Sequence, residues 1–262
     1  MDENQIILID KPAGISSFGV VAKVRGRLKA ELGHKVKVGH TGTLDPFATG
    51  LLILLTGKMT KKSNELLKLD KEYIAELKLG YTSSTGDPEG EITEVTFSKH
   101  GEVFSKKKPN DSPDFYNISP LKNSTSKASI KKFSEAEDVV KIIPREYYPS
   151  LEKVTSVINS FIGKINQKVP AFSAIKINGE RAYKLARAGK DFETPTREVT
   201  IYNIEILEYN YPTLKIRCEV SSGTYIRALA EDIGKALQTG AYLTALRRTK
   251  VGKYDIKDAS VL

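Results

Sequence analysis

Strand-like runs and amphipathic helical stretches are interleaved along this chain of 262 residues, and their irregular order is the feature that most constrains the fold. No strand–helix–strand unit recurs, and no internal repeat is visible. The pattern therefore predicts an α+β domain built on a mixed, mostly antiparallel central sheet flanked by helices and loops. We expect strands near residues 5–9, 51–55, 73–79, 92–97, 172–177, 199–208 and 214–221, and helices near 17–32, 151–161, 180–188 and 224–237.

Residues 98–143 differ in character from the rest of the chain, because Lys, Ser, Asn and Pro dominate there. Eight Lys and three acidic residues within 98–133 supply +5 of the formal net charge of +9, which favours a polyanionic partner such as nucleic acid. Such a stretch buries too little apolar surface to offset its ordering entropy. We therefore expect a flexible Lys/Ser-rich insert within a single domain that spans residues 1–262.

Side chains suited to metals and nucleotide cofactors are scarce. Cys218 is the single cysteine, which excludes an intrachain disulfide and a cysteine metal cluster. The histidines, His34, His40 and His100, lack the spacing of a metal site, and no dinucleotide fingerprint or P-loop is present. We expect no metal and no cofactor, so the chemistry must come from carboxylates, arginines, tyrosines or hydroxyls.

The chain begins without the basic segment and apolar run of a secretory signal. Its longest apolar run, residues 51–55, is far too short to cross a bilayer. A cytoplasmic location is therefore expected.

The loop over residues 39–46 combines two glycines, two threonines and a proline, which predicts an ordered turn rather than a helix. Pro46 keeps Asp45 out of the helical region, so the Asp45 carboxylate is presented from a rigid turn. Taken by itself, Asp45 has two interpretations. It either caps the turn, as Asp-Pro commonly does, or it carries chemistry.

A second segment, residues 221–227, places Arg227 in the first turn of a predicted helix, where the helix dipole disfavours a cation. A nearby carboxylate or a bound phosphate would compensate it, and a solvated surface arginine is the alternative. Basic and aromatic residues also interleave over 176–187, from Lys176 onwards. That pattern is weak evidence for RNA contact, because such a helix face is usually only solvated.

Together these segments resemble the TruB family of tRNA pseudouridine synthases. The matching segments run in the family's order from residue 5 to about residue 254 and are interrupted only by the 98–143 insert. The 39–52 segment, which contains Asp45, matches the catalytic motif of the family almost letter for letter. The other matching segments are residues 10–17, 71–73, 169–179, 222–227 and 246–249.

The resemblance implies a pseudouridine synthase fold and assigns Asp45 as the catalytic nucleophile, which adds to the target nucleotide at the ribose C1′ or the base C6. Arg227 would keep the Asp45 carboxylate ionised. Tyr73 would stack on the flipped uracil and help to remove the C5 proton.

Further roles follow from the same resemblance. His40 would fill the gap left in the RNA stack, and Leu246 would line the uracil pocket. The residues expected to bind substrate are His40, Leu246, Tyr225 and Lys176. The residues expected to support the site are Lys11, Pro12, Gly42 and Thr43.

The implied substrate is uridine-55 in the T-loop of tRNA, which an enzyme reaches by flipping the base out of its stack. The implied protein is a monomer that contacts the T-loop and stem, with no membrane partner. Bacterial members usually continue into a small RNA-binding PUA domain, and none is expected here because the sequence stops at Leu262. The lysine-rich insert either holds phosphates in its place or is simply solvated.

Two rival functions remain open. The chain could act as an RNA-binding chaperone that helps to fold tRNA without needing its chemistry. It could also be a synthase for another RNA, as the related guide-RNA-dependent synthases are, although those need the PUA domain. A DNA-binding regulator has no support beyond net charge.

Overall fold

The computed structural model describes residues 3–98, 103–105, 139–140 and 148–262. Its main feature is a ten-stranded sheet in the order β16-β1-β3-β14-β4-β13-β12-β9, with β2 paired to β3 and β15 paired to β14. Only the β1–β16 and β3–β14 pairs are parallel, so the predicted mixed, mostly antiparallel sheet is confirmed. The strands are β1 (Ile6–Lys11), β2 (Val38–Thr41), β3 (Thr49–Thr56), β4 (Lys71–Leu79), β9 (Gly163–Lys168), β12 (Thr196–Asn210), β13 (Thr213–Val220), β14 (Ala241–Val251), β15 (Tyr254–Asp255) and β16 (Ser260–Val261).

The first part of the sheet is covered on both faces. Helix α1 (Ser17–Leu32) packs on one face, where its apolar residues contact Leu52 and Leu54 of β3. The residues of β3 that alternate with these, such as Ile53, pack on the opposite face against the short helices η1 (Gly57–Lys62) and α2 (Ser63–Leu67). Because neither face of β3 is exposed to solvent, apolar residues occupy consecutive positions of the strand and form the continuous apolar run in the sequence.

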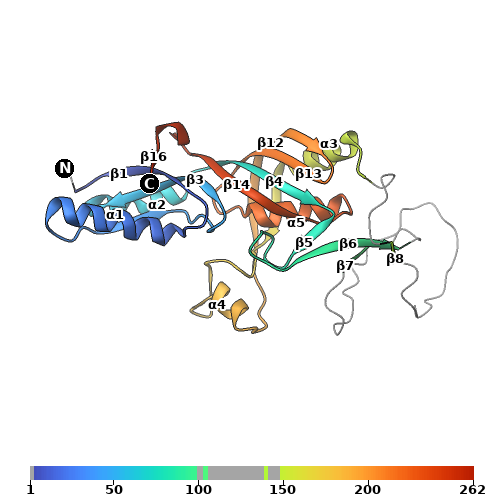
Figure 1. Cartoon of the computed structure of the whole chain (residues 1–262), viewed down its shortest axis with the longest axis horizontal. Coiled ribbons are helices and arrows are strands. Elements are labelled where there is room, and N and C mark those ends of the chain that lie inside the picture. The colour runs from blue at the N-terminus through green and yellow to red at the C-terminus, as the bar shows by residue number, and fades with distance from the viewer. Residues whose placement is uncertain (1–2, 99–102, 106–138, 141–147) are drawn as a thin grey trace.

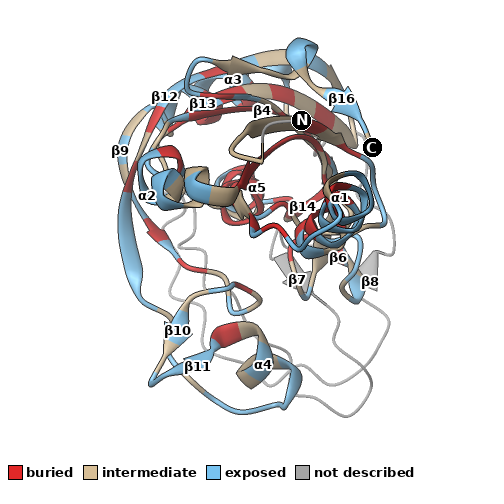
Figure 2. Ribbon diagram, turned by 90° about the vertical axis from the view of Figure 1, so that its left-hand side faces the viewer, coloured by how far each residue is buried: buried red, intermediate tan, exposed pale blue. Residues whose placement is uncertain are grey.

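The second part of the sheet carries the largest core. Helices α3 (Leu151–Ser160) and α5 (Ile226–Ala236) pack against β4, β12, β13 and β14 (Figure 1). The apolar stripe of α5 includes Leu229 and Ile233, which are fully buried. The buried residues gather along this interior, as Figure 2 shows.

The two parts meet where β3 and β14 pair in parallel over only two residue pairs, Thr49 with Arg247 and Gly50 with Arg248. The loop over residues 42–48 leads into β3 at this seam. Leu44 and Ala48 of that loop pack in the core of the second part, whereas Leu52 and Leu54 of β3 pack in the first. Asp45 therefore stands at the junction of the two cores.

Two smaller elements lie outside the main sheet. Strands β5 (Tyr81–Ser83), β6 (Ile92–Ser98), β7 (Val103–Ser105) and β8 (Val139–Val140) form one of them. Strands β10 (Lys176–Ile177) and β11 (Glu180–Arg181) with helix α4 (Ala182–Arg187) form the other, which projects from the body as a lobe (Figures 1 and 2). A last short helix, η3 (Ile256–Asp258), precedes β16, and no helix of the described residues is long and apolar enough to span a membrane.

Several sequence predictions need correction at the level of single elements. The strand expected at 172–177 is limited to β10, and the helix expected from residue 180 begins at Ala182 because residues 180–181 form β11. Residues 39–41, expected in a loop, belong to β2. Strand β9 was not anticipated, since its alternate positions are mostly polar. The predicted flexible insert lies largely outside the described residues; its described parts, β7 and β8, pair with β6.

Gly50 offers a stability test of the seam. Its φ is +104°, and a Cβ there would lie 2.3 Å from the backbone oxygen of Arg248. Because the obstacle is backbone, Gly50→Ala should lower the free energy of unfolding by about 3 kcal/mol or more, combining left-handed strain with steric overlap. Gly33→Ala is the matched control, because Gly33 also has a positive φ, +76°, but nothing lies within 4 Å of a Cβ there. It should cost only about 1 kcal/mol. Equal losses in urea denaturation would show that the seam tolerates the methyl group.

Candidate active site

A buried lysine, Lys11, holds the loop that carries Asp45 in place. The Nζ of Lys11 donates hydrogen bonds to the carbonyl oxygens of Pro12 (2.8 Å), Ile15 (2.8 Å) and Pro46 (3.2 Å). Burial lowers the pKa of Lys11 to about 8, against the opposing effect of the Asp45 charge. The three N–H donors of a protonated Lys11 thus match three carbonyl acceptors. They connect the loop over residues 12–15 to Pro46, the residue after Asp45. This geometry fits the supporting role expected for Lys11 and Pro12.

Two further contacts fix the same loop. The hydroxyl of Ser17 donates to the carbonyl of Leu44 and accepts from the N–H of Leu44, both at 2.9 Å. The buried guanidinium of Arg248 donates to the carbonyls of Leu51 (2.7 Å) and Gly42 (3.0 Å). Gly42 has a φ of +79°, which explains the glycine there, and Thr43 is exposed at the loop surface.

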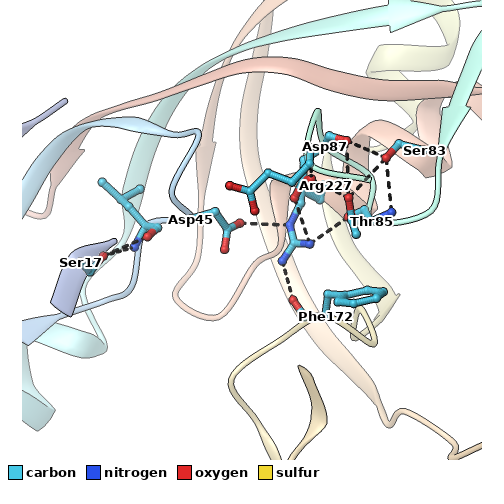
Figure 3. A network of polar contacts seen from close by, with 9 residues as sticks. Ser17, Asp45, Ser83, Thr85, Asp87, Phe172 and Arg227 are labelled. Carbon is cyan, nitrogen blue, oxygen red and sulfur yellow. Dashed lines mark hydrogen bonds and ion pairs between the residues drawn. The ribbon is translucent and has the colours of Figure 1, made fainter. Parts of the chain in front are cut away.

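Asp45 faces Arg227, which enters from α5 on the far side of the seam (Figure 3). The Nε of Arg227 lies 3.1 Å from the Asp45 Oδ2, while Nη1 lies 3.3 Å from the Asp87 Oδ2. The guanidinium also donates to the carbonyls of Thr85 and Phe172, each at 2.8 Å. One guanidinium thus contacts four groups from three other segments of the chain, and the single ammonium of a lysine cannot reproduce this planar arrangement.

Arg227 lies in the first turn of α5, as predicted, and two carboxylates compensate its unfavourable position there. Its side chain is 6% exposed and that of Asp87 is 4% exposed, whereas 35% of the Asp45 side chain is open to solvent. The pair Arg227–Asp87 is therefore buried behind Asp45. Of the three groups, Asp45 is the one that a large ligand can reach.

Asp87 is itself fixed by the turn between β5 and β6. Its Oδ1 accepts hydrogen bonds from the Thr85 hydroxyl and from the N–H of Glu89, and its carbonyl accepts one from Ser83 (Figure 3). Gly86 in this turn has a φ of +75° and packs against α5, where a Cβ would lie 2.5 Å from Glu231. The turn therefore holds the Asp87 carboxylate against Arg227.

Burial and neighbouring charges together set the pKa of Asp45. Burial raises the pKa of Asp45; the Arg227 charge lowers it, and the Asp87 charge raises it further. Arg227 does favour the ionised form, but the net pKa is still higher than that of a free aspartate. The effect expected of Arg227, which favours the ionised form of Asp45, is therefore opposed by burial and by Asp87, because two carboxylates share one guanidinium.

Tyr73 and Leu246 lie in the same buried cluster as Leu44 and Ala48 of the Asp45 loop. Tyr73 belongs to β4 and is in register with Arg248 of β14, and Leu246 lies two residues earlier on that strand. Tyr73 is 8% exposed and Leu246 is 7% exposed. The structure thus brings both side chains into the core that also holds Leu44 and Ala48 of the Asp45 loop, and their expected contacts with the uracil stay predictions.

The remaining predicted residues are more dispersed. His40 lies in β2 next to the loop, and burial, with a contribution from Arg248, lowers its pKa. Tyr225 caps α5, where its N–H and carbonyl bind the buried side chain of Gln167. Lys176 is exposed on the projecting lobe.

Sequence reasoning missed the roles of Asp87, Ser17 and Arg248. The turn at 83–90 was recognised, but nothing local marks its aspartate as buried. The burial of Arg248 could have been predicted, because Arg248 lies two residues after Leu246 on one strand and so faces the same side of the sheet. A charged residue on that buried side needs a partner. Among the described residues no group of three or more His, Cys, Asp or Glu side chains could hold a metal.

Comparison with solved structures defines the class. The chain matches the structure described as "Crystal Structure of a Cbf5-Nop10-Gar1 Complex" with a TM-score of 0.60 and 26% identity, over 99% of this chain and 52% of that one. It matches "Structure of H/ACA RNP bound to a substrate RNA containing 2'-deoxyuridine" with a TM-score of 0.56 and 25% identity, over 99% and 51%. The chain spans about half the length of these neighbours. Its fold is that of the pseudouridine synthases, which are isomerases.

The family follows from sequence comparison. The model described as TruB family pseudouridylate synthase (N terminal domain) matches residues 29–110 and 121–226, and that of the tRNA pseudouridylate synthase B C-terminal domain matches residues 227–262. The chain therefore belongs to the TruB family, and the predicted resemblance is confirmed. The second match begins within α5 and includes the central strand β14, so both matched segments share one sheet.

Curated relatives cover nearly the full chain. "tRNA pseudouridine synthase B" of Phocaeicola vulgatus is 40% identical over 98% of this chain and 89% of its own length. The protein of that name in Flavobacterium johnsoniae is 38% identical over 98% and 92%, and that of Borreliella burgdorferi is 35% identical over 99% and 73%.

Proposed function

We propose that the protein isomerises uridine to pseudouridine at position 55 in the T-loop of tRNA, with Asp45 as nucleophile. The observation that carries this proposal is the ion pair between the partly exposed Asp45 and the buried Arg227. Asp45 lies on a loop that Lys11 and Ser17 hold in place. The names of the curated relatives support tRNA as the substrate. Residues 1–262 act as one catalytic domain in this proposal.

The reaction breaks the bond between N1 of the base and C1′ of the ribose and forms one between C5 and C1′. The ionised Asp45 carboxylate adds either to C1′, which releases the base as an anion, or to C6, which loosens the same bond. The base then rotates, C5 bonds to C1′, and Asp45 is released. The C5 proton leaves, and N1 gains a proton, so substrate and product are isomers and no external reactant is consumed.

The surrounding residues divide the remaining tasks. Arg227 fixes the Asp45 carboxylate and favours its ionised form, and Asp87 fixes Arg227. Tyr73 contacts the flipped base and takes part in removal of the C5 proton, and Leu246 lines the pocket beside it. The target uridine leaves its stack at a cost of a few kcal/mol, which the pocket contacts recover.

The direct test is incubation of the protein with unmodified tRNA transcripts, followed by chemical mapping of pseudouridine. We expect a single modification at uridine-55, and none in a transcript with cytidine at that position. Modification only elsewhere in the tRNA, or only in another RNA, would overturn the proposed target. No modification of any RNA would overturn the proposed reaction.

A further inference from the structure

Phe18 is a large apolar side chain that the structure leaves in solvent, next in sequence to a residue that anchors the Asp45 loop. It lies in the first turn of α1 and is 72% exposed. Its neighbour Ser17 forms the reciprocal hydrogen bonds with Leu44, the residue before Asp45. The position of Phe18 is therefore coupled to the loop that presents the nucleophile.

The Phe18 ring does not stand alone. It meets the imidazole of His40 edge to face, with ring centroids 5.0 Å apart and planes at 81°. His40 comes from β2, just before the same loop, and its position is fixed by pairing with Leu54 of β3. Two flat side chains from two separately anchored elements therefore meet next to the residues that anchor the Asp45 loop.

The surroundings suit a polyanion. Helix α1 has no acidic residue in its first turn, and the dipole places positive charge at that end. Its exposed surface carries four basic side chains, Lys23, Arg25, Arg27 and Lys29, and one acidic side chain, Glu31. Single exposed apolar residues are common on proteins, but an aromatic ring that contacts a second ring and lies on a helix with exposed basic residues has the composition of a site that stacks bases.

We propose that Phe18 is a substrate-contacting residue that, together with His40, holds an unstacked base of the RNA loop next to the flipped uridine. This inference rests on the proposed function, because it assigns a contact to the same substrate. RNA loops are recognised largely through splayed bases that stack on aromatic side chains, and an exposed phenylalanine offers a flat face without a competing hydrogen bond. Phe18 binds the base and takes no part in bond making.

The test uses T-arm hairpin RNAs that carry 2-aminopurine at one loop position at a time, because stacking quenches its fluorescence. Binding is measured with Asp45→Asn protein, which prevents turnover, with and without Phe18→Ala. We expect quenching at a position that flanks the target uridine and its loss with Phe18→Ala. In protein with Asp45 intact, Phe18→Ala should lower kcat/KM on the hairpin by roughly 10-fold, the size of one lost base stack. The melting temperature should not change, since the ring is exposed.

Two further variants separate stacking from simple apolar contact. Phe18→Trp should keep both the quenching and kcat/KM, whereas Phe18→Leu should keep neither. Tyr202→Ala is the matched control, because Tyr202 is an aromatic residue 50% exposed on β12, and its removal should leave the quenching and kcat/KM unchanged. Wild-type quenching and kcat/KM in Phe18→Ala or in Phe18→Leu would overturn the proposal. If the wild-type protein binds the hairpin but never forms pseudouridine, the proposed function fails, and the quenching experiment still tests Phe18.

Discussion

Asp45→Asn is expected to abolish pseudouridine formation while leaving tRNA binding within a few-fold of the wild type. The amide is nearly isosteric with the carboxylate but cannot form the covalent bond to the nucleotide. We expect kcat to fall by more than about 10⁴-fold, the order seen when a covalent nucleophile is removed. Release of tritium from C5-labelled uridine in tRNA measures the chemical step, and filter binding measures affinity.

The fold should survive this change, because Arg227 keeps three of its four partners. Asp87 and the carbonyls of Thr85 and Phe172 remain within reach of the guanidinium. Asp258→Asn serves as the control, since Asp258 is exposed on η3 near the C-terminus. Tritium release by Asp45→Asn at a tenth of the wild-type rate would remove Asp45 from the role of nucleophile.

The same variant decides between catalysis and the rival chaperone function. A chaperone that needs no chemistry would refold tRNA equally well after the Asp45→Asn substitution, whereas pseudouridine formation would be lost. The two functions can also coexist, so refolding and tritium release should be measured on the same preparations.

Regular elements with strong local signals could be predicted from the sequence. Helix α1 has the predicted bounds because its apolar residues recur on one face, Ser16 caps its first turn, and Gly33 ends it in a left-handed conformation. Strand β9 could not be predicted, because it lies at the edge of the sheet and has Gln167 at its buried position. That amide is buried only because it binds the backbone of Tyr225, which lies 58 residues away.

The same distinction between local signals and long-range packing applies to the residues of the site. The meeting of Arg227 with a carboxylate was anticipated from one local conflict, a cation at the start of a helix. Asp87 could not be anticipated, because its turn contains Ser, Thr, Gly and Pro, a composition typical of solvated loops. Only the long-range packing of that turn against α5 buries its carboxylate, and sequence spacing carries no information about such packing.

Arg227→Gln should give the second large loss, about 10²–10³-fold in kcat/KM, comparable to removing one preorganised charged donor from an active site. Glutamine cannot span Asp45, Asp87 and two carbonyls, and it removes the positive charge that both carboxylates contact. Arg227→Lys should lose nearly as much, because a single ammonium lacks the planar fork. Steady-state kinetics with tRNA measures the loss, and circular dichroism checks the fold.

The acid limb of the pH profile of kcat/KM should shift in opposite directions when Arg227 and Asp87 are replaced. Asp45 acts in its ionised form, so activity falls as the pH drops through the pKa of Asp45, which burial already raises. Arg227 lowers that pKa, so Arg227→Gln should move the acid limb of kcat/KM to higher pH. Asp87 raises the same pKa, so Asp87→Asn should move the limb to lower pH. A merely structural role for Arg227 and Asp87 would lower the rate and leave the limb in place. Shifts in the same direction for both variants would show that the acid limb does not report the ionisation of Asp45.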